Sequence, residues 1–380
     1  MKYVGIIAEY NPFHNGHARL FDAVKDAEAV VCVMSGPFVQ RGEAAVLPPH
    51  VRAEMALAAG ADVVLELPFP FAAASARYFA TAGVRALSGI GVDTLVFGSE
   101  TGDLERLTAL AKRAPSHAQR QSPATGDAAA YFDTLGEEIS SNDILAVEYL
   151  RALQAEAPFL TPFALKREGT AYRAIENEGA YPSATAIRAA LARGEDVSAF
   201  LPSEAVEIFN DAVAKYGIAD TARLGDAMLA FLRGSGAALA AQAGLAECGG
   251  GLLERLVRAA GEANDYSSLC RAAATKRYTD GRIRRALLCM LAGVMPADLT
   301  AHPAYLRLLG ANQRGRSFLA ETYRRRTVPV VTKPAEIKAL GEAAARQRTL
   351  SLAADGLYAI ATGGKLTPHA LQTVSPILKK

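Results

Sequence analysis

Short apolar runs alternate with stretches of helical composition over the first hundred residues. The apolar runs cover residues 3–8, 29–34, 62–67 and 93–98, and Ala-rich stretches of helical length lie at 51–59 and 73–87. Runs of this length that are rich in Val, Ile and Leu are typical of strands buried on both faces of a parallel sheet. The order predicts an α/β fold, a Rossmann-like doubly wound parallel sheet with right-handed crossovers.

The same kind of pattern continues beyond this core after one interruption. Residues 114–128 contain Pro and Ser but few large apolar side chains, so we expect a surface loop there. A helix is expected over residues 144–155, an extended segment over 159–168, and a further helix from Ser183 onward. We therefore place the end of the first domain near Gly194 and treat residues 1–194 as one unit.

The remainder of the chain, residues 195–380, has mainly helical patterning. From Ser203 onward apolar residues recur at helical spacing, and in this sequence only the short run 328–332 suggests a strand. A chain of 380 residues also exceeds what one hydrophobic core usually supports. We therefore expect a second, mostly α-helical domain.

Composition and charge narrow the class of protein without naming a function. With 51% hydrophobic and 21% charged residues, the chain is typical of a globular protein. The first apolar run ends at Glu9 and is too short for a signal peptide or a membrane span, so we expect a cytoplasmic protein. The net charge of +2 means that nucleic-acid binding would depend on local basic clusters. The cysteines form no metal-binding or disulfide pattern and are expected to be reduced core residues: Cys32, Cys248, Cys270 and Cys289.

The segment EYNPFHNGH, residues 9–17, directly follows the first predicted strand and leads into a helix that begins near Gly16. In an open parallel sheet, ligands bind beyond the carboxyl ends of the strands, and the free N–H groups of a helix N-terminus attract phosphate. His14 and His17 could place two imidazoles near phosphate groups, while Gly16 would let the backbone approach closely. The alternative is a capped helix with two incidental histidines.

A second segment, SATAIR at residues 183–188, opens the last helix of the first domain. The hydroxyls of Ser183 and Thr185 and the guanidinium of Arg188 could bind the β- and γ-phosphates of a nucleotide, because arginine holds phosphate oxygens with two hydrogen bonds. The alternative is an ordinary helix start, in which Ser183 is the N-cap.

Together these two segments resemble the two-part signature of the HxGH nucleotidyltransferase superfamily. Further segments are similar to the bacterial tRNA(Met) cytidine acetate ligase family: VMSGPFVQRGE, ADVVLELPFPFA, FGSE, SNDILAVEYL and TKRYTDGRIRR. The resemblance covers about residues 1–190 and 275–290. It implies a fold of the nucleotidyltransferase type, activation of acetate by ATP as acetyl-adenylate, and acetylation of the N4 amine of the wobble cytidine of elongator tRNA(Met). It implies no protein partner.

The resemblance also implies a set of site residues. His14, His17 and Arg188 would be catalytic. Plain structural roles remain open for three of the others, with Gly98 in a turn, Asn142 as a helix cap and Arg167 as an exposed edge residue. The ATP-binding residues would be Ile7, Ala8, Glu9, Tyr10, Asn11, Pro12, Phe13, His14, Asn15, Gly16, His17, Ala18, Arg19, Leu20, Gly98, Asn142, Arg167, Ser183, Thr185 and Arg188.

The implied chemistry needs charge stabilisation more than proton transfer. Acetate is already ionised at pH 7, so its attack on the α-phosphate needs no general base, and the site must hold two anions together. Asp62, Glu66 and Glu100 near strand ends could hold Mg²⁺. Carboxylates in such places are as often helix caps or ion-pair partners, so Mg²⁺ is left as an option and no metal ligand is assigned.

The segment TKRYTDGRIRR is the candidate RNA-binding region. Basic residues beside an aromatic ring suit phosphate contact and base stacking on an anticodon loop. A solvated helix face is the alternative. The residues assigned to tRNA binding are Lys276, Arg277, Tyr278, Arg282 and Arg285, and a second basic stretch contains Arg314, Arg316, Arg324, Arg325 and Arg326.

Two other functions remain open at the level of sequence. A small-molecule adenylyltransferase would use the same two motifs, but such enzymes are usually single domains, whereas this chain has a long helical remainder. A non-catalytic RNA-binding protein with this fold would have no need to keep His14, His17 and Arg188.

Overall fold

The structure is a computed structural model that describes residues 1–114, 139–167 and 182–379. From residue 115 onward, the predicted surface loop 114–128 lies outside the described residues.

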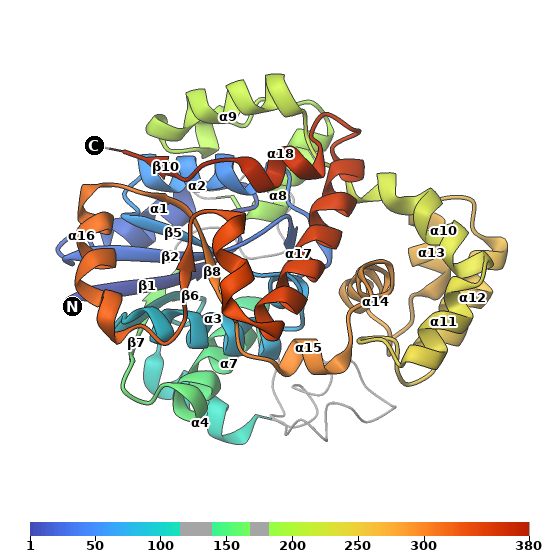
Figure 1. Cartoon of the computed structure of the whole chain (residues 1–380), viewed down its shortest axis with the longest axis horizontal. Helices are drawn as coiled ribbons and strands as arrows, with labels where there is room; N and C mark the ends of the chain where they lie inside the picture. The colour runs from blue at the N-terminus through green and yellow to red at the C-terminus, as the bar shows by residue number, and fades with distance from the viewer. Residues whose placement is uncertain (115–138, 168–181, 380) are drawn as a thin grey trace.

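One sheet forms the centre of the larger lobe (Figure 1), with the strand order β10-β8-β5-β2-β1-β6-β7 and with β9 paired to β8. The strands β5, β2, β1, β6 and β7 are all parallel, which confirms the predicted doubly wound sheet. The four apolar runs are β1, β2, β5 and β6, and the predicted extended segment contains β7. The bounds are β1 Tyr3–Ala8, β2 Ala29–Ser35, β5 Val63–Leu67, β6 Thr94–Ser99, β7 Thr161–Lys166, β8 Leu306–Ala311, β9 Val330–Val331 and β10 Ile377–Leu378.

The second half of the chain contributes strands to this sheet, which the sequence pattern did not predict for β8 or β10. Strand β8 pairs antiparallel with β5, and β10 pairs parallel with β8. Periodicity does not distinguish the short run LRLLGA of β8 from a buried helical turn. The run forms a strand because it pairs with the edge of β5. The expected short strand at 328–332 is confirmed as β9. The predicted boundary near residue 194 therefore does not separate two independent sheets, because the central sheet contains strands from both sides of that residue.

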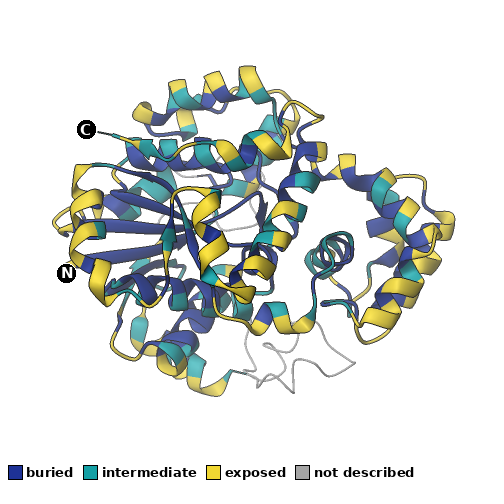
Figure 2. Ribbon diagram, in the orientation of Figure 1, coloured by how far each residue is buried: buried dark blue, intermediate teal, exposed yellow. Residues whose placement is uncertain are grey.

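Helices cover both faces of the sheet, and alternate residues of each strand face opposite cores. On β1, Tyr3 and Ile7 belong to one core and Val4 and Ile6 to the other. Strands β1, β2 and β5 are therefore buried on both faces (Figure 2). The first face is covered by α3 Ala76–Ile90, α4 Leu104–Arg113, α7 Ser141–Glu156 and α16 Gln313–Thr322, and the second by α1 Asn15–Asp22, α2 Pro49–Ala58, α8 Ala184–Ala192 and α9 Ser203–Tyr216.

Helices α10 to α14 form a smaller lobe, and α15, α17 and α18 also contribute side chains to its core. In Figure 1, α10 to α14 gather on the side of α17 that faces away from the sheet. Phe38 and Phe69 from the first half join this core, and the hydroxyl of Tyr358 donates to the carbonyl of Ala45 at 2.9 Å. All four cysteines are buried and free, as expected. The bounds are α10 Gly225–Arg233, α11 Gly236–Ala243, α12 Leu252–Glu262, α13 Tyr266–Ala273, α14 Asp280–Ala292, α15 Pro296–Thr300, α17 Glu342–Ala361 and α18 Pro368–Thr373.

Short elements complete the fold. The hairpin of β3 Phe38–Val39 and β4 Glu43–Ala44 lies between β2 and α2 in the chain. The 3₁₀ turns are η1 Phe71–Ala73, η2 Ser198–Phe200, η3 Thr221–Leu224, η4 Tyr323–Arg325 and η5 Pro334–Leu340.

Candidate active site

A cavity of about 1320 Å³, counted with its open mouth, lies at the carboxyl ends of β1 and β6. Strand β1 pairs with β2 on one side and with β6 on the other, so the chain winds away from it in both directions. This is the switch point at which open α/β sheets bind ligands. The predicted ATP residues that line it are Ile7, Ala8, Glu9, Tyr10, His14, Gly16, His17, Arg19, Leu20, Gly98, Asn142 and Arg167.

His14 is the N-cap of α1, and its ring is fixed by the helix backbone. Its Nδ1 accepts the N–H of Gly16 at 3.0 Å, and the Nδ1 of His17 accepts the N–H of His14 at 3.3 Å. An Nδ1 that accepts a hydrogen bond carries no proton, so each neutral ring holds its proton on Nε2. The two rings lie 3.9 Å apart between centroids. The local structure therefore leaves one N–H donor on each histidine for a ligand.

Both histidines are neutral at physiological pH. Burial, with help from the nearby charges of Arg167 and Arg188, lowers the pKa of His14 to about 3. Burial, followed by His14 and Arg167, also lowers the pKa of His17 well below its usual range. Two neutral donors can stabilise charge that develops on a phosphate without adding a proton equilibrium of their own.

Gly16 lines the cavity, and its lack of a side chain also makes room for the histidines. A Cβ at this position would lie 2.8 Å from Cε1 of His14. The absence of a side chain therefore makes room for the capping ring.

A wall opposite the histidines comes from β6, α7 and the end of β7. The carboxylate of Glu100 accepts a hydrogen bond from Nδ2 of Asn142 at 2.6 Å and lies 3.5 Å from Nε of Arg167. Gly98 leaves space for the Arg167 side chain, since a Cβ there would lie 3.3 Å from its Cγ. The N-cap of α7 is Ser140, so Asn142 does not have the capping role that was the alternative. These side chains thus line one cavity.

The SATAIR segment lies beside the cavity, but its side chains have other partners. Ser183 is buried, and its hydroxyl caps α8 by accepting the N–H of Ala186 at 3.2 Å. Arg188 donates to the carbonyl of Asn11 at 2.9 Å and to the hydroxyl of Thr185 at 3.3 Å. Of this region, the cavity lining among the described residues includes Pro182 alone. The predicted residues that do not line it are Asn11, Pro12, Phe13, Asn15, Ala18, Ser183, Thr185 and Arg188.

Glu43, in the QRGE segment, was not predicted as a site residue. Its carboxylate lies 3.7 Å from Nη2 of Arg188 and forms an ion pair with Arg284 of α14. It therefore connects the motif arginine of the first half to the basic helix of the second. The match of QRGE to the family was the only signal in the sequence, because the ion-pair partners lie far away in the chain.

The predicted residue Glu9 links the cavity to further lining residues that were not predicted from the sequence. Glu9 was predicted from its motif, and its Oε1 accepts the N–H of Gln40 at 2.8 Å, which brings the QRGE segment to the cavity. Burial raises the pKa of Glu9. The lining residues without a sequence prediction include Gln40, Arg41, Ser141, Leu145, Tyr149, Lys166 and Pro182.

The TKRYT segment is basic, but two of its predicted residues are not available for RNA. Tyr278 is 7% exposed, and its hydroxyl donates to the carbonyl of Gly250, so the expected base stacking on this ring is wrong. Arg277 and Arg282 flank the ring with guanidinium carbons 5.0 and 5.2 Å from its centroid. Arg285 lies 3.6 Å from the carboxylate of Glu247, with both side chains largely buried. Lys276 is exposed.

The second basic stretch lies at the opposite edge of the sheet. Arg314 donates to the carbonyl of Glu28 at 3.1 Å, just before β2 begins, and Arg325 donates to that of Gly91, ahead of β6. The amino ends of parallel strands lie away from the cavity at their carboxyl ends. This stretch therefore does not face the candidate active site.

The carboxylates considered for Mg²⁺ have separate positions. Asp62 accepts the N–H of Val30 at 2.8 Å and a hydrogen bond from Asn312, also at 2.8 Å. Glu66 lines a second cavity, and Glu100 lines the first. Within residues 1–114, 139–167 and 182–379, no three His, Cys, Asp or Glu side chains gather as a metal site would require. Likewise, no helix of these ranges has the length and apolar composition to cross a membrane.

Known proteins resemble this chain over nearly all of its length. A family model described as HIGH Nucleotidyl Transferase matches residues 1–373. The tRNA(Met) cytidine acetate ligase of Syntrophotalea carbinolica is 39% identical, over 89% of this chain and 86% of that protein. The enzyme of the same name from Caldanaerobacter subterraneus subsp. tengcongensis is 35% identical, over 89% and 90%.

Solved structures agree with the sequence relatives. Apo TmcAL of Thermotoga maritima superposes with a TM-score of 0.89 at 28% identity, and each chain is covered completely. The same protein bound with α-thio ATP gives a TM-score of 0.87, also at 28% identity and full coverage. Because both the sequence match and the fold extend through the two halves, this chain belongs to the tRNA(Met) cytidine acetate ligase family of the HIGH nucleotidyl transferases.

Proposed function

We propose that this chain is an ATP-dependent ligase that forms acetyl-adenylate and acetylates the N4 amine of the wobble cytidine of elongator tRNA(Met). The observation that carries the proposal is the pair of neutral Nε2–H donors of His14 and His17 at the end of β1. The names of the relatives support the reaction and the tRNA, and the α-thio ATP in the Thermotoga structure supports ATP as cosubstrate. A protein with these substrates would act in the cytoplasm.

In the first step, a carboxylate oxygen of acetate attacks the α-phosphorus of ATP, and pyrophosphate leaves. No proton has to be removed, because acetate is ionised at pH 7. The site must hold two anions close together and stabilise the negative charge that builds on the phosphate. His14 and His17 would donate to the phosphates from one side of the cavity, and Arg167 would supply positive charge from the other. Arg188 would bind the leaving phosphates after turning from its contacts with Asn11 and Thr185.

In the second step, the N4 amine of cytidine attacks the acetyl carbonyl of the mixed anhydride. The bond from that carbon to the phosphate oxygen breaks, AMP leaves, and the new amide nitrogen loses a proton to water. The high free energy of the anhydride compensates for the weak nucleophile.

We propose that residues 1–194 carry the nucleotide chemistry and that residues 195–380 dock the tRNA. Lys276, Arg277 and Arg282 are the basic residues proposed for phosphate contact, since Lys276 is exposed and Arg277 and Arg282 are half-buried.

The test is ATP–pyrophosphate exchange with a panel of carboxylates, followed by analysis of tRNA for acetylated cytidine. We expect exchange that depends on acetate, and acetylated cytidine only when tRNA(Met) is present. Exchange that ignores acetate but depends on a phosphate-bearing small molecule would instead identify an adenylyltransferase. No exchange with any acceptor would leave an RNA-binding protein without this chemistry.

A further inference from the structure

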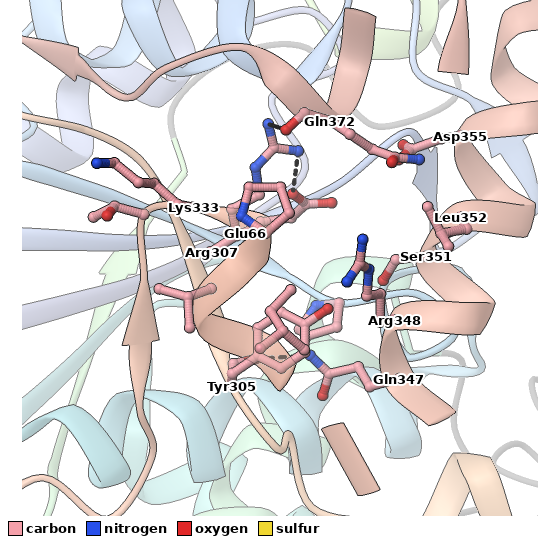
Figure 3. Close-up of a pocket in the computed structure, with 15 residues that line it drawn as sticks. Glu66, Tyr305, Arg307, Lys333, Gln347, Arg348, Ser351, Leu352, Asp355 and Gln372 are labelled. Atoms are coloured by element: carbon pink, nitrogen blue, oxygen red, sulfur yellow. Dashed lines mark hydrogen bonds and ion pairs between the residues drawn. The ribbon is translucent and has the colours of Figure 1, made fainter. Parts of the chain in front are cut away.

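A second cavity lies at the same edge of the sheet, between the ends of β5 and β8 and the helices η5, α17 and α18 (Figure 3). Its volume is about 590 Å³, counted with its open mouth. It shares no lining residue with the cavity at β1 and has no role in the ATP chemistry proposed above.

The floor of this cavity is polar. Asp355 and Glu66 are 6% and 8% exposed, and Arg307 of β8 reaches toward Glu66, with Nη1 3.7 Å from its Oε2 (Figure 3). Arg307 is held in place by the carbonyl of Leu371, at 2.7 Å. Burial raises the pKa of Asp355 to about 8, with the charge of Glu66 as the next cause. At neutral pH this carboxyl therefore has both a hydroxyl donor and a carbonyl acceptor. Burial also raises the pKa of Glu66, while the charge of Arg307 opposes this shift.

The walls are apolar, and basic side chains also line the cavity. Tyr305, 5% exposed, and the side chains of Pro68, Ile337 and Leu352 line the cavity above its floor. Two further basic residues line the cavity from different sides: Lys333 is exposed and Arg348 is half-buried (Figure 3). An occupant that matches all three zones has a flat apolar body, a polar edge with both donors and acceptors, and an anionic group that stays at the surface.

We propose that this cavity binds one unpaired nucleotide of the RNA substrate, with the base inside and the phosphate at Lys333 and Arg348. A base edge pairs N–H donors with ring nitrogen and carbonyl acceptors, which suits Asp355 and Glu66. The ring faces lie against the apolar walls, and the cations neutralise the backbone. The proposal deepens the proposed function and rests on it for the identity of the RNA.

The position of the cavity fits an RNA strand that also reaches the active site. Glu66 lies directly against Gly36 at the end of β2, where a Cβ would collide with its Oε1. The buried Arg52 donates to the carbonyl of Gly36 and, at 2.6 Å, to that of Glu9, which lines the ATP cavity. The two cavities are therefore separated by little more than one strand end and one arginine. An anticodon loop has several unpaired bases, so one can enter the second cavity while the wobble base reaches the first.

The experiment measures the Kd of tRNA(Met) by fluorescence anisotropy for the double variant Lys333→Ala with Arg348→Ala, for Asp355→Leu, and for Lys338→Ala as the matched control. Lys338 is an exposed lysine of η5, the turn that Lys333 precedes, and it does not line the cavity. We expect Kd to rise about tenfold in the double variant and in Asp355→Leu, because phosphate contacts and base contacts are lost, and to stay within about twofold in Lys338→Ala. Acetate-dependent pyrophosphate exchange should be unchanged in all three.

An unchanged Kd of tRNA(Met) in the double variant would overturn the proposal. The double variant changes only the residues Lys333 and Arg348, so its Kd remains informative even if Asp355→Leu fails to fold. Titration with CMP, AMP, GMP and UMP, with the first cavity saturated by a non-hydrolysable ATP analogue, distinguishes the source of the nucleotide. Binding of a free mononucleotide that Asp355→Leu abolishes, together with unchanged tRNA Kd, would overturn RNA as the source. A wild-type protein that binds tRNA but makes no acetylated cytidine would refute the proposed acetyl transfer while leaving the Kd comparison intact.

Discussion

His14 combines two roles that a single residue rarely has. Its Nδ1 caps α1 by accepting the N–H of Gly16, and the same bond fixes the proton on Nε2, where the proposed chemistry needs a donor. Removal of the whole ring would therefore damage the helix start and the site together. A test of catalysis must therefore remove the donor at Nε2 and keep an acceptor at the position of Nδ1.

The change His14→Asn keeps an acceptor near the position of Nδ1 and removes the Nε2 donor. We expect a normal melting temperature and a fall of about a hundredfold in acetyl-adenylate formation, the usual cost of one lost transition-state donor. His14→Ala is the control and should lose stability as well, by about 1 kcal/mol, because the cap is lost. Pyrophosphate exchange near the wild-type rate in His14→Asn would show that the motif only builds the helix.

The buried histidines also make stability depend on pH. The pKa of His14 falls from 6.5 to about 3 in the fold, so between these values the unfolded chain binds more protons than the folded one. The free energy of unfolding must then decrease as pH is lowered from 6.5 toward 3, with His17 acting in the same direction. Urea unfolding at pH 7 and pH 5 measures the loss, which His14→Asn should reduce. An equal loss in that variant would mean that other groups carry the pH dependence.

At the scale of elements, the QRGE segment connects the ATP site to the helical lobe. Gly42 has φ of +70° and touches the backbone of α14, since a Cβ would lie 2.7 Å from the backbone nitrogen of Arg285. The adjacent Glu43 faces both Arg188 and Arg284. The segment therefore sets how α14 sits beside the cavity.

The change Gly42→Ala should disturb this contact. A methyl group would strain the backbone and push against α14, and we expect the free energy of unfolding to fall by about 2 kcal/mol or more. Gly261→Ala in α12 is the matched control, because nothing lies within 4 Å of its added Cβ. Helix propensity predicts that this control gains stability, by up to about 1 kcal/mol. Chemical denaturation compares the three proteins, and equal stability of Gly42→Ala and wild type would show that the helix can shift without cost.

At the scale of the whole molecule, the two basic stretches identified from the sequence lie at separate places. The TKRYT segment precedes α14, which Glu43 connects to the cavity edge of the sheet, whereas Arg314 and Arg325 lie at the amino ends of the strands. A tRNA that reaches the active site can contact the TKRYT segment, whereas the stretch with Arg314 and Arg325 faces away from the site.

Charge reversal should therefore separate RNA docking from ATP chemistry. Lys276→Glu with Arg277→Glu should weaken tRNA binding and flatten its salt dependence by roughly one to two units of slope, while acetate-dependent pyrophosphate exchange is spared. Since Arg277 also holds the carbonyl of Gly250 at 2.7 Å, Lys276→Glu alone is the variant that does not disturb the fold. The exposed Arg324 gives the control Arg324→Glu, which should bind tRNA normally. Unchanged binding in the first variants and weak binding in Arg324→Glu would place the RNA at the other edge.

Local sequence patterns were sufficient to predict those parts of the structure that depend on residues adjacent in the chain. The apolar runs of β1, β2, β5 and β6 are buried on both faces in any parallel sheet, so their composition alone predicts them. The capping of α1 by His14 and of α8 by Ser183 also follows from adjacent residues. For the same reason the sequence by itself determined the Rossmann-like class of the fold and the position of the HNGH segment at the end of the first strand.

Only the tertiary structure decided what depends on residues far apart in the chain. Strand β8 needs the edge of β5, the ion pair of Glu43 needs Arg284, 241 positions later, and Tyr278 is withdrawn from the surface by the carbonyl of Gly250. The second cavity likewise joins Glu66 to Asp355 across most of the sequence. Such contacts leave no periodic signal, because each partner alone reads as an ordinary apolar, charged or aromatic residue until the fold brings the pair together.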